Sequence, residues 1–146
     1  MSLVADLSSR IGAEIGVGDW VTITQDRIDR FADATGDHQW IHVDVERAAS
    51  GPFGSTIAHG FLTLGLIPAI APSVDVPGTK MAINYGLDRV RFIAPVPVGS
   101  RVRARSVLQE VSEVAGGVQV KSEVTIEIEG AAKPACVAET LARFYV

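Results

Sequence analysis

Two histidines, two aspartates and a tryptophan lie within the ten residues TGDHQWIHVD, residues 35–44. Asp37 and His42 are five positions apart, and the apolar residues Trp40 and Ile41 between them can partly desolvate the turn. A carboxylate and an imidazole placed around one water molecule can activate it from two sides, because histidine is the commonest general acid or base and a carboxylate can share its proton. We therefore predict that Asp37 and His42 form a catalytic pair.

A second candidate for chemistry follows in the sequence AHGF, residues 58–61. If a helix begins at Gly60, its first backbone N–H groups have no partner within the helix and lie at the positive end of its dipole. Glycine has no side chain, so a carbonyl oxygen can approach this backbone closely. Such donors stabilise the oxyanion of acyl chemistry, and the loss of one donor costs on the order of 3 kcal/mol in other enzymes. We predict that Gly60 is an oxyanion donor.

Local signals place the Asp37 segment between two helices. Thr24 has the side chain of a helix N-cap and Gly36 stands where a C-terminal cap belongs, so residues 25–35 are expected to be helical. Asp37 then lies in the loop just beyond this helix. Asp44 is expected to cap a second, short helix.

The remaining elements predict how these groups are held. Residues 60–73 are apolar around the whole circumference of a helix, which predicts one long, buried helix. Apolar and polar residues alternate over residues 117–130, and this period of two is typical of a half-buried antiparallel strand. Further strands are expected over residues 17–24, 80–96, 100–114 and 136–146. We therefore predict an α+β fold, with a curved antiparallel sheet of about five strands wrapped around the long helix.

The composition excludes several classes of protein. The chain has 146 residues, 47% hydrophobic and 21% charged, which predicts one globular domain over residues 1–146. Its formal charge of −4 offers no basic surface for nucleic acid. The single cysteine, Cys136, and a start without a secretory pattern predict a cytoplasmic protein. The longest apolar run, residues 60–72, is shorter than the roughly 20 residues that span a bilayer, so no membrane association is expected.

Three stretches of the sequence resemble a known family. FADATGDHQWIHVDVERA (residues 31–48) followed by STIAHGFLTLGL (residues 55–66) resembles the MaoC-like dehydratases, also called (R)-specific enoyl-CoA hydratases, and especially their nodulation-protein-N-like branch. INYGLDRVRFIAPVPVGSRVRARSVL (residues 83–108) extends the resemblance over nearly the whole chain. The resemblance implies a hot-dog fold, in which a curved sheet surrounds a central helix and two copies usually pair into one continuous sheet.

The resemblance also implies an activity. Asp37 and His42 would hold the water that is added syn across a trans-2-enoyl-CoA, and Gly60, next to His59, would donate its N–H to the thioester oxygen. No cofactor is implied apart from the coenzyme A of the substrate, whose phosphates would need basic groups. By composition alone the candidates for those groups are Lys80, Arg89, Arg91, Arg101 and Arg103.

The chain departs from the commoner family motif between the two catalytic positions. Gln39 and Trp40 stand where that motif has Asn-Pro, so the substrate's shape near the water is expected to differ. Trp40 is expected to be a wall of the site, and Asn84 is expected to contribute a polar contact to the substrate. His59, just before the helix, is expected to make a structural hydrogen bond, with contact to the substrate as the alternative. The departure keeps open a non-catalytic acyl-CoA-binding or partner-interaction protein, and hot-dog domains also include thioesterases.

Other chemistries fit the sequence less well. His38 and His42 are four residues apart, an interval that can bind zinc on one face of a helix, but His38 follows a glycine expected to end the helix, and no glutamate lies between the two histidines. No metal is therefore expected. The predicted meander leaves an open sheet edge, and pairing of that edge with a second copy predicts a homodimer.

Overall fold

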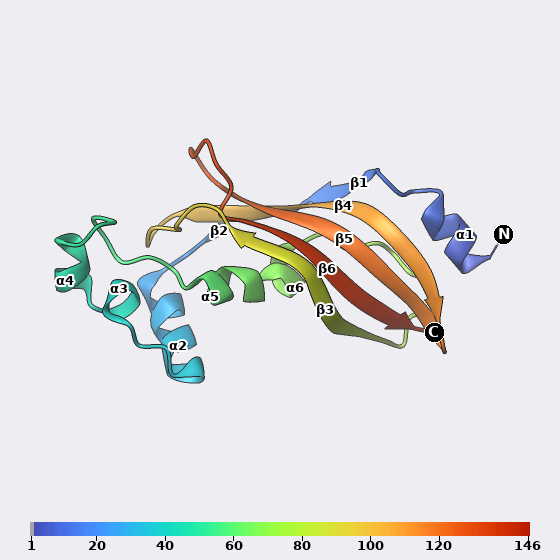
Figure 1. Ribbon diagram of the computed structural model, residues 1–146, viewed down its shortest axis with the longest axis horizontal. Coiled ribbons are helices and arrows are strands. Elements are labelled where there is room, and N and C mark those ends of the chain that lie inside the picture. The colour runs from blue at the N-terminus through green and yellow to red at the C-terminus, as the bar shows by residue number, and fades with distance from the viewer. Residues whose placement is uncertain (1) are drawn as a thin grey trace.

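The computed structural model describes residues 2–146, which form a curved antiparallel sheet with helices along its concave side and at its ends (Figure 1). The strands are β1 (Glu14–Val17), β2 (Val21–Thr22), β3 (Met81–Phe92), β4 (Arg101–Val114), β5 (Gly117–Ile128) and β6 (Cys136–Tyr145). Their hydrogen-bonded order is β1-β4-β5-β6-β3, and β2 pairs with β4 off this path. The expected α+β fold and the β4-β5-β6 meander are confirmed, with six strands in place of about five.

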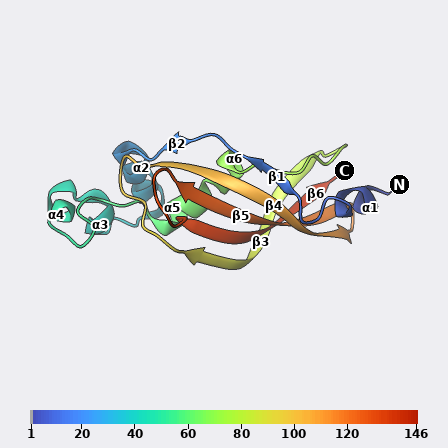
Figure 2. The same ribbon diagram turned by 90° about the horizontal axis from the view of Figure 1, so that it is seen from above.

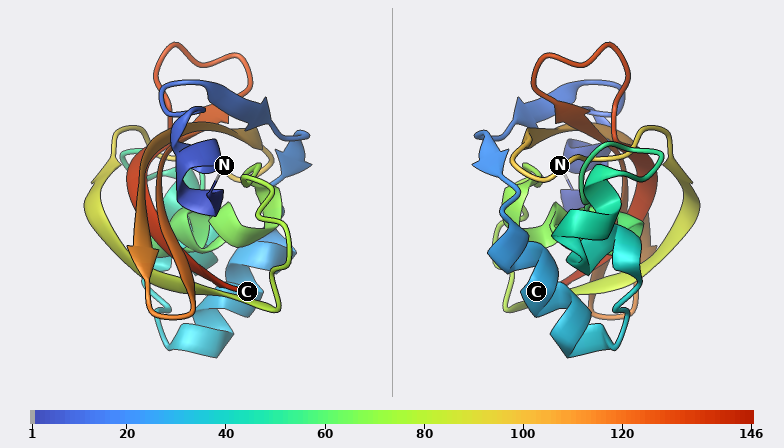
Figure 3. Two further views of the ribbon diagram at one scale, coloured as in Figure 1. Left: turned by 90° about the vertical axis from the view of Figure 1, so that its right-hand side faces the viewer. Right: turned by 90° about the vertical axis from the view of Figure 1, so that its left-hand side faces the viewer.

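The helices are short. They are α1 (Leu3–Ser8), α2 (Gln25–Thr35), α3 (Trp40–Val43), α4 (Val45–Ala49), α5 (Gly60–Gly65) and α6 (Ile67–Ile70). Helices α2, α3 and α4 lie together at one end of the sheet, and α1 lies at the other (Figure 1). Seen along the long axis, the sheet curves around α5 and α6 (Figure 3). Among residues 2–146, no helix has both the length and the apolar character needed to cross a membrane.

Helix α2 follows its sequence signals. The Thr24 hydroxyl accepts a hydrogen bond from the backbone N–H of Arg27, and Gly36 ends the helix in the left-handed conformation, with φ 84°. Ile28 and Ala32 share a face that is fully buried. The caps and the apolar face together fix where α2 ends, and therefore where Asp37 begins the next segment.

The expectation of one long central helix is wrong. Helix α5 ends at Gly65, and Leu66 donates to the carbonyls of both Leu62 and Thr63 as the turn tightens. Pro68 explains the break, because it has no N–H to donate to the carbonyl of Leu64, and its ring excludes that carbonyl from the α-helical position. The chain then continues as the separate short helix α6.

The central helices are also less buried than expected. Leu62 is 6% exposed, but Phe61 on the same helix is 69% exposed. One flank of these helices faces the edge strand β3, in which all residues except Val90 are exposed. The sheet of a single chain therefore covers only part of the apolar surface of α5 and α6.

The predicted strand over residues 17–24 is divided into β1 and β2. The division falls at Gly18, whose N–H bonds to the carbonyl of Ala104 and whose backbone lies against the carbonyl of Ile70. A side chain at this position would collide with that carbonyl, so the chain passes close to the end of α6 only because residue 18 is glycine. Helix α1 was not expected from the sequence at all. Seen from above, β1 and β3 run along opposite edges of the sheet (Figure 2).

Candidate functional site

Asp37, His42 and His59 meet at the end of the sheet where α2 and α3 lie. Their potential ligand atoms all lie within 4.8 Å of one another. His42 and His59 are 6% and 2% exposed, whereas Asp37 is exposed. His42 lies in the one-turn helix α3, although the sequence was expected to place it in a loop. The predicted pair is therefore brought together, with the carboxylate on the solvent side and the imidazole inside.

The protonation of His42 is determined by its surroundings. Its Nδ1 lies 2.7 Å from the carbonyl oxygen of Ile57. A carbonyl can only accept a hydrogen bond, so Nδ1 carries the proton and Nε2 of the neutral ring keeps its lone pair. Burial, with a smaller contribution from neighbouring His59, lowers the pKa of His42 below its ordinary value of 6.5, although the Ile57 bond and Asp37 oppose this shift. His42 is therefore suited to accept a proton at neutral pH.

His59 holds this arrangement from the inside. Its Nε2 donates to the backbone carbonyl of Asp37 at 2.9 Å, which ties the loop after α2 to the start of α5. Its ring is stacked on that of His42, with centroids 3.9 Å apart and planes at 21°, and its centroid lies 4.7 Å from that of the Phe31 ring. The geometry gives His59 a structural part, and its contact with substrate stays a prediction.

The same stacking bears on metal binding. The nitrogens left free are Nε2 of His42 and Nδ1 of His59, the latter buried without a partner among residues 2–146. Each lone pair lies in its own ring plane, and because the two stacked rings have centroids 3.9 Å apart and planes inclined by only 21°, the lone pairs do not converge on one point close to both nitrogens. The cluster in this arrangement suits proton transfer better than shared metal coordination.

Gly60 is the first residue of α5, as expected. A Cβ atom there would lie 3.0–3.1 Å from the ring of Phe92, so glycine also permits close packing against the end of β3. Because α5 has only six residues, its macrodipole is smaller than that of the long helix expected. The role of Gly60 as an oxyanion donor rests on its local N–H group and stays a prediction.

Gln25 and Thr56 support His42 and were not found from the sequence. The Gln25 Nε2 donates to the backbone carbonyl of His42 at 2.8 Å and to Asp29 at 2.9 Å. Its Oε1 accepts from the hydroxyl of Thr56 at 2.5 Å. Thr56 is 1% exposed and precedes Ile57, whose carbonyl receives the His42 N–H. Gln25 thus ties together the two backbone segments that fix the imidazole.

Two of the expected substrate contacts lie away from this cluster. Trp40 packs on the α3–α4 corner, where its ring lies 4.2 Å from the guanidinium of Arg47 and against Gly51. Asn84 lies in β3 and lines a cavity whose lining does not include Asp37, His42 or His59. Contact of either residue with substrate remains a prediction.

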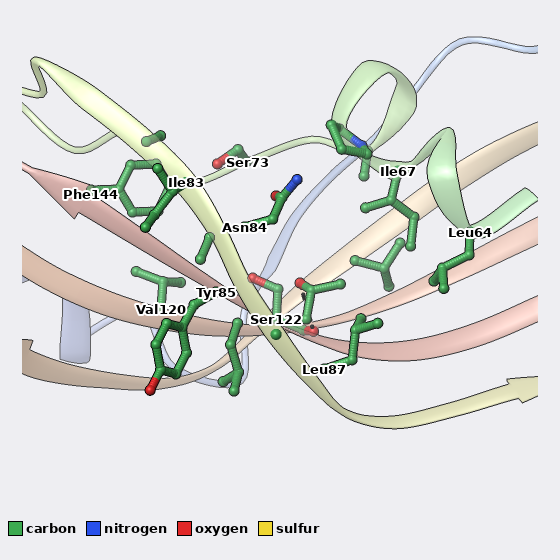
Figure 4. Close-up of a pocket in the computed structure, with 18 of the residues that line it drawn as sticks. Leu64, Ile67, Ser73, Ile83, Asn84, Tyr85, Leu87, Val120, Ser122 and Phe144 are labelled. Atoms are coloured by element: carbon green, nitrogen blue, oxygen red, sulfur yellow. Dashed lines mark hydrogen bonds between the residues drawn. The ribbon is translucent and has the colours of Figure 1, made fainter. Parts of the chain in front are cut away.

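That cavity, of about 570 Å³, lies between α5, α6 and the inner face of β3, β5 and β6 (Figure 4). Leu64 and Ile67 line it from the helices, and Val120 and Phe144 from the sheet. It begins about one helical turn from Gly60, because Leu64 is four residues further along α5 at roughly 1.5 Å per residue. The cavity could therefore receive part of a molecule whose other end lies at Gly60.

Two of the basic residues named as phosphate candidates are already paired. Arg101 bonds Glu129 at 2.8 Å, and Arg103 bonds Glu127 at 3.0 Å. Arg91 donates to the carbonyl of Val90. These contacts make Arg101 and Arg103 parts of a charged ladder on the outer face of the sheet.

Comparisons with known proteins agree with this architecture. The family model described as MaoC like domain matches residues 6–130. A protein named 3-hydroxyacyl-thioester dehydratase Z, from Mycobacterium tuberculosis, is 61% identical over 143 residues, covering 97% of this chain and 95% of that protein. Nodulation protein N of Rhizobium leguminosarum bv. viciae is 53% identical, covering 92% of this chain and 86% of that protein.

A solved structure is also similar. The unliganded R-hydratase of Pseudomonas aeruginosa superimposes with a TM-score of 0.70 at 26% identity, covering 92% of this chain and 81% of that one. The resemblance seen in the sequence, including that to the nodulation-protein-N branch, is confirmed, and with it the hot-dog fold. The chain belongs to the MaoC-like dehydratase family.

Proposed function

We propose that the protein is a hydro-lyase that catalyses the reversible hydration of a trans-2-enoyl-CoA to an (R)-3-hydroxyacyl-CoA. The observation that carries the proposal is the meeting of the Asp37 carboxylate with the His42 imidazole, whose Nδ1 proton is committed to Ile57 so that Nε2 is free. The names of the dehydratase and the R-hydratase to which the chain is similar support the same chemistry. The reaction needs no metal and no redox cofactor.

In this mechanism the paired side chains hold one water molecule. Asp37 acts as general base and His42 shares the water through Nε2, which accepts a hydrogen bond. The water oxygen bonds to C3 of the enoyl group while its proton passes to the pair, and the electrons of the double bond move toward the thioester oxygen. The Gly60 N–H stabilises the charge on that oxygen. A proton then returns from the pair to C2 on the same face, and dehydration is the reverse.

The proposal also gives the substrate a position. A thioester at Gly60 would extend its acyl chain along α5 toward the cavity bounded by Leu64 and Ile67. These two residues give the cavity apolar walls, which suit an alkyl chain. As expected from the sequence, we also propose that the protein acts without a cofactor and that it is located in the cytoplasm.

The test is loss of enoyl absorbance with crotonyl-CoA. Asp37→Asn and His42→Gln are each expected to lower kcat by about 10²- to 10⁴-fold, the usual contribution of a positioned acid or base. Asp33→Asn and His38→Gln are matched controls, because these residues are exposed and bond each other at 3.0 Å beside the site. They should keep nearly full activity. Equal rates for wild type and Asp37→Asn would refute the assigned role.

The stereochemistry and the alternative function are tested in the same assay. Product coupled to an (S)-specific 3-hydroxyacyl-CoA dehydrogenase should not be oxidised, whereas an (R)-specific enzyme should oxidise it. If wild-type protein binds acyl-CoA but turns over neither enoyl-CoA nor saturated acyl thioester, it is an acyl-binding protein. Release of free coenzyme A from a saturated thioester would instead indicate a thioesterase.

We also propose that the protein is a homodimer joined along β3. This 12-residue strand pairs only with β6 among the strands of residues 2–146 and exposes a row of apolar side chains. Met81, Ile83, Tyr85 and Leu87 are each between 39% and 54% exposed. A long apolar edge of this kind is unstable against pairing with another strand. Light scattering should give a dimer mass for the wild type and a monomer mass for Ile83→Lys, with Val45→Lys on α4 as the control. A monomeric wild type would contradict the proposal.

A further inference from the structure

The cavity beneath α5 and α6 contains a group of polar side chains at one level of an otherwise apolar surface. Ser122 on β5 lies directly opposite Thr140 on β6. Asn84 on β3 lies opposite Ala142, the next residue of β6 on the same face. Ser73 lines the cavity from the segment after α6. Figure 4 shows Asn84 and Ser122 near the middle of the space, between Phe144 and Leu64.

These polar groups have little to bond within the protein. The Thr140 hydroxyl reaches the carbonyl of Ser122 only at 3.4 Å, and the Ser73 hydroxyl reaches that of Val74 at 3.3 Å. Within residues 2–146, the side chains of Asn84 and Ser122 have no hydrogen-bond partner. Ser73 and Asn84 are exposed and Ser122 and Thr140 are half-buried, so without a ligand their free donors and acceptors face water in the cavity. Their free bonding capacity is therefore directed to whatever enters the cavity.

The chemistry of the lining limits what that is. Among the described residues that line the cavity, none carries a charge. A carboxylate or an ammonium group would therefore be desolvated without a counter-ion. The flanking residues of the same strands, Val120 and Val124 on β5, offer only methyl groups. A ligand that matches the surface is apolar along most of its length and carries one neutral group that can both donate and accept hydrogen bonds.

We propose that this cavity selects acyl thioesters whose tail carries a hydroxyl group, over plain alkyl tails and over tails that end in a carboxylate. The proposal rests on the proposed function, which places the thioester at Gly60. From there Leu64 is about 6 Å away at roughly 1.5 Å per residue, so the oxygen group lies well beyond the reacting carbons. Ser122, Thr140 and Asn84 are then specificity residues.

The test measures binding of saturated thioesters, which does not depend on turnover. Calorimetry compares octanoyl-CoA, a set of derivatives with one hydroxyl group at successive positions from mid-chain to the end, and suberyl-CoA, which ends in a carboxylate. The best hydroxylated ligand should bind the wild type about three- to tenfold more tightly than octanoyl-CoA, the effect of one neutral hydrogen bond. Suberyl-CoA should bind most weakly. Ser122→Ala and Thr140→Val should abolish the preference, and Thr125→Val on the opposite face of β5 should keep it.

Thermal unfolding distinguishes a specificity role from a structural one. Because their hydroxyls have weak or absent protein partners, Ser122→Ala and Thr140→Val should unfold at the wild-type temperature or above it. A clear loss of stability would mean that the hydroxyls hold the sheet together, and it would overturn the assignment.

The outcomes also separate this proposal from the proposed function. Turnover of crotonyl-CoA, whose tail is too short to reach the cavity, combined with equal binding of octanoyl-CoA and every hydroxylated ligand, would overturn only the preference for oxygenated tails. Tightest binding of suberyl-CoA would do the same. Failure to turn over crotonyl-CoA together with failure to bind any of these thioesters would refute the proposed function and this proposal with it.

Discussion

Gln25 should be as important to His42 as any residue in direct contact with its ring. Its side chain bonds the backbone carbonyl of His42 and the hydroxyl of Thr56. Gln25→Leu leaves both groups without a partner, and Thr56 is 1% exposed, so solvent cannot readily replace the bond. Each buried group that loses its partner costs about 1–3 kcal/mol, so we expect the free energy of unfolding to fall by about 2–6 kcal/mol.

A double-mutant cycle isolates the bond between the two side chains. Thr56→Val removes the hydroxyl and leaves the part-buried Gln25 oxygen unpaired, which should cost about 1 kcal/mol. In Gln25→Leu combined with Thr56→Val neither the orphaned hydroxyl nor the unpaired amide oxygen remains, so the double variant should lose about 2–4 kcal/mol less than the sum of the single variants. Gln109→Leu is the control, because within residues 2–146 the Gln109 side chain bonds only Glu123, on the outer face of the sheet. It should change stability by less than about 0.5 kcal/mol.

The same variants should separate positioning from binding. Because misplacing a catalytic group by about 1 Å can cost on the order of 10²-fold, folded Gln25→Leu should lose about 10- to 100-fold in kcat with little change in KM for crotonyl-CoA. Unfolding in urea and enzyme kinetics on the same samples provide both measurements. Strictly additive stabilities, or a fully active Gln25→Leu, would show that this network does not hold His42.

Three further predictions follow from the geometry. Because burial lowers the pKa of His42, the acid limb of the pH profile of kcat/KM should lie below pH 6.5. The fold should also lose stability as the pH drops below 6.5, because the unfolded chain then takes up this proton more readily than the folded one. In His42→Gln this component of the pH dependence of stability should be absent, and an acid limb above pH 6.5 would argue against a neutral His42. Gly60→Ala should destabilise the fold by about 1 kcal/mol through contact with Phe92, whose half-exposed ring can partly shift, and Phe92→Leu should relieve this loss in urea unfolding. Burial raises the pKa of the Cys136 thiol to about 11, so a thiol reagent at pH 8 should label it only as fast as the protein unfolds, and rapid labelling of native protein would contradict the buried position.

The parts of the fold that the sequence predicted well depend on local signals. Helix α2 has its cap at Thr24 and its left-handed glycine at Gly36, and both act within one turn of the helix ends. Strands β4 and β5 bury every second residue over much of their length, because a sheet with one face on the core imposes a period of two, whereas β6 shows this pattern only over its first three residues. The pairing of Asp37 with His42 was likewise within reach, since both come from one short segment.

The errors have different physical origins. The break in the central helix was encoded locally by Pro68, but the apolar composition of residues 60–73 concealed it. The division between β1 and β2 was not encoded locally, because it depends on Gly18 meeting the carbonyl of Ile70, a residue 52 positions away. Local sequence patterns predict the conformation of a segment, but they do not predict contacts between residues that are far apart in the sequence.

The support of His42 shows the same limit at the site itself. Gln25 and Thr56 are 31 residues apart and have types that are ordinary on a protein surface, so nothing in the sequence marks them. Their importance arises because α2 and the segment before α5 approach the same imidazole from two sides. A search for reactive residue types finds Asp37 and His42 but passes over the uncharged groups that decide whether the two can act together. For this reason the effect of Gln25→Leu on kcat is a more demanding test of the site than the loss of activity in Asp37→Asn.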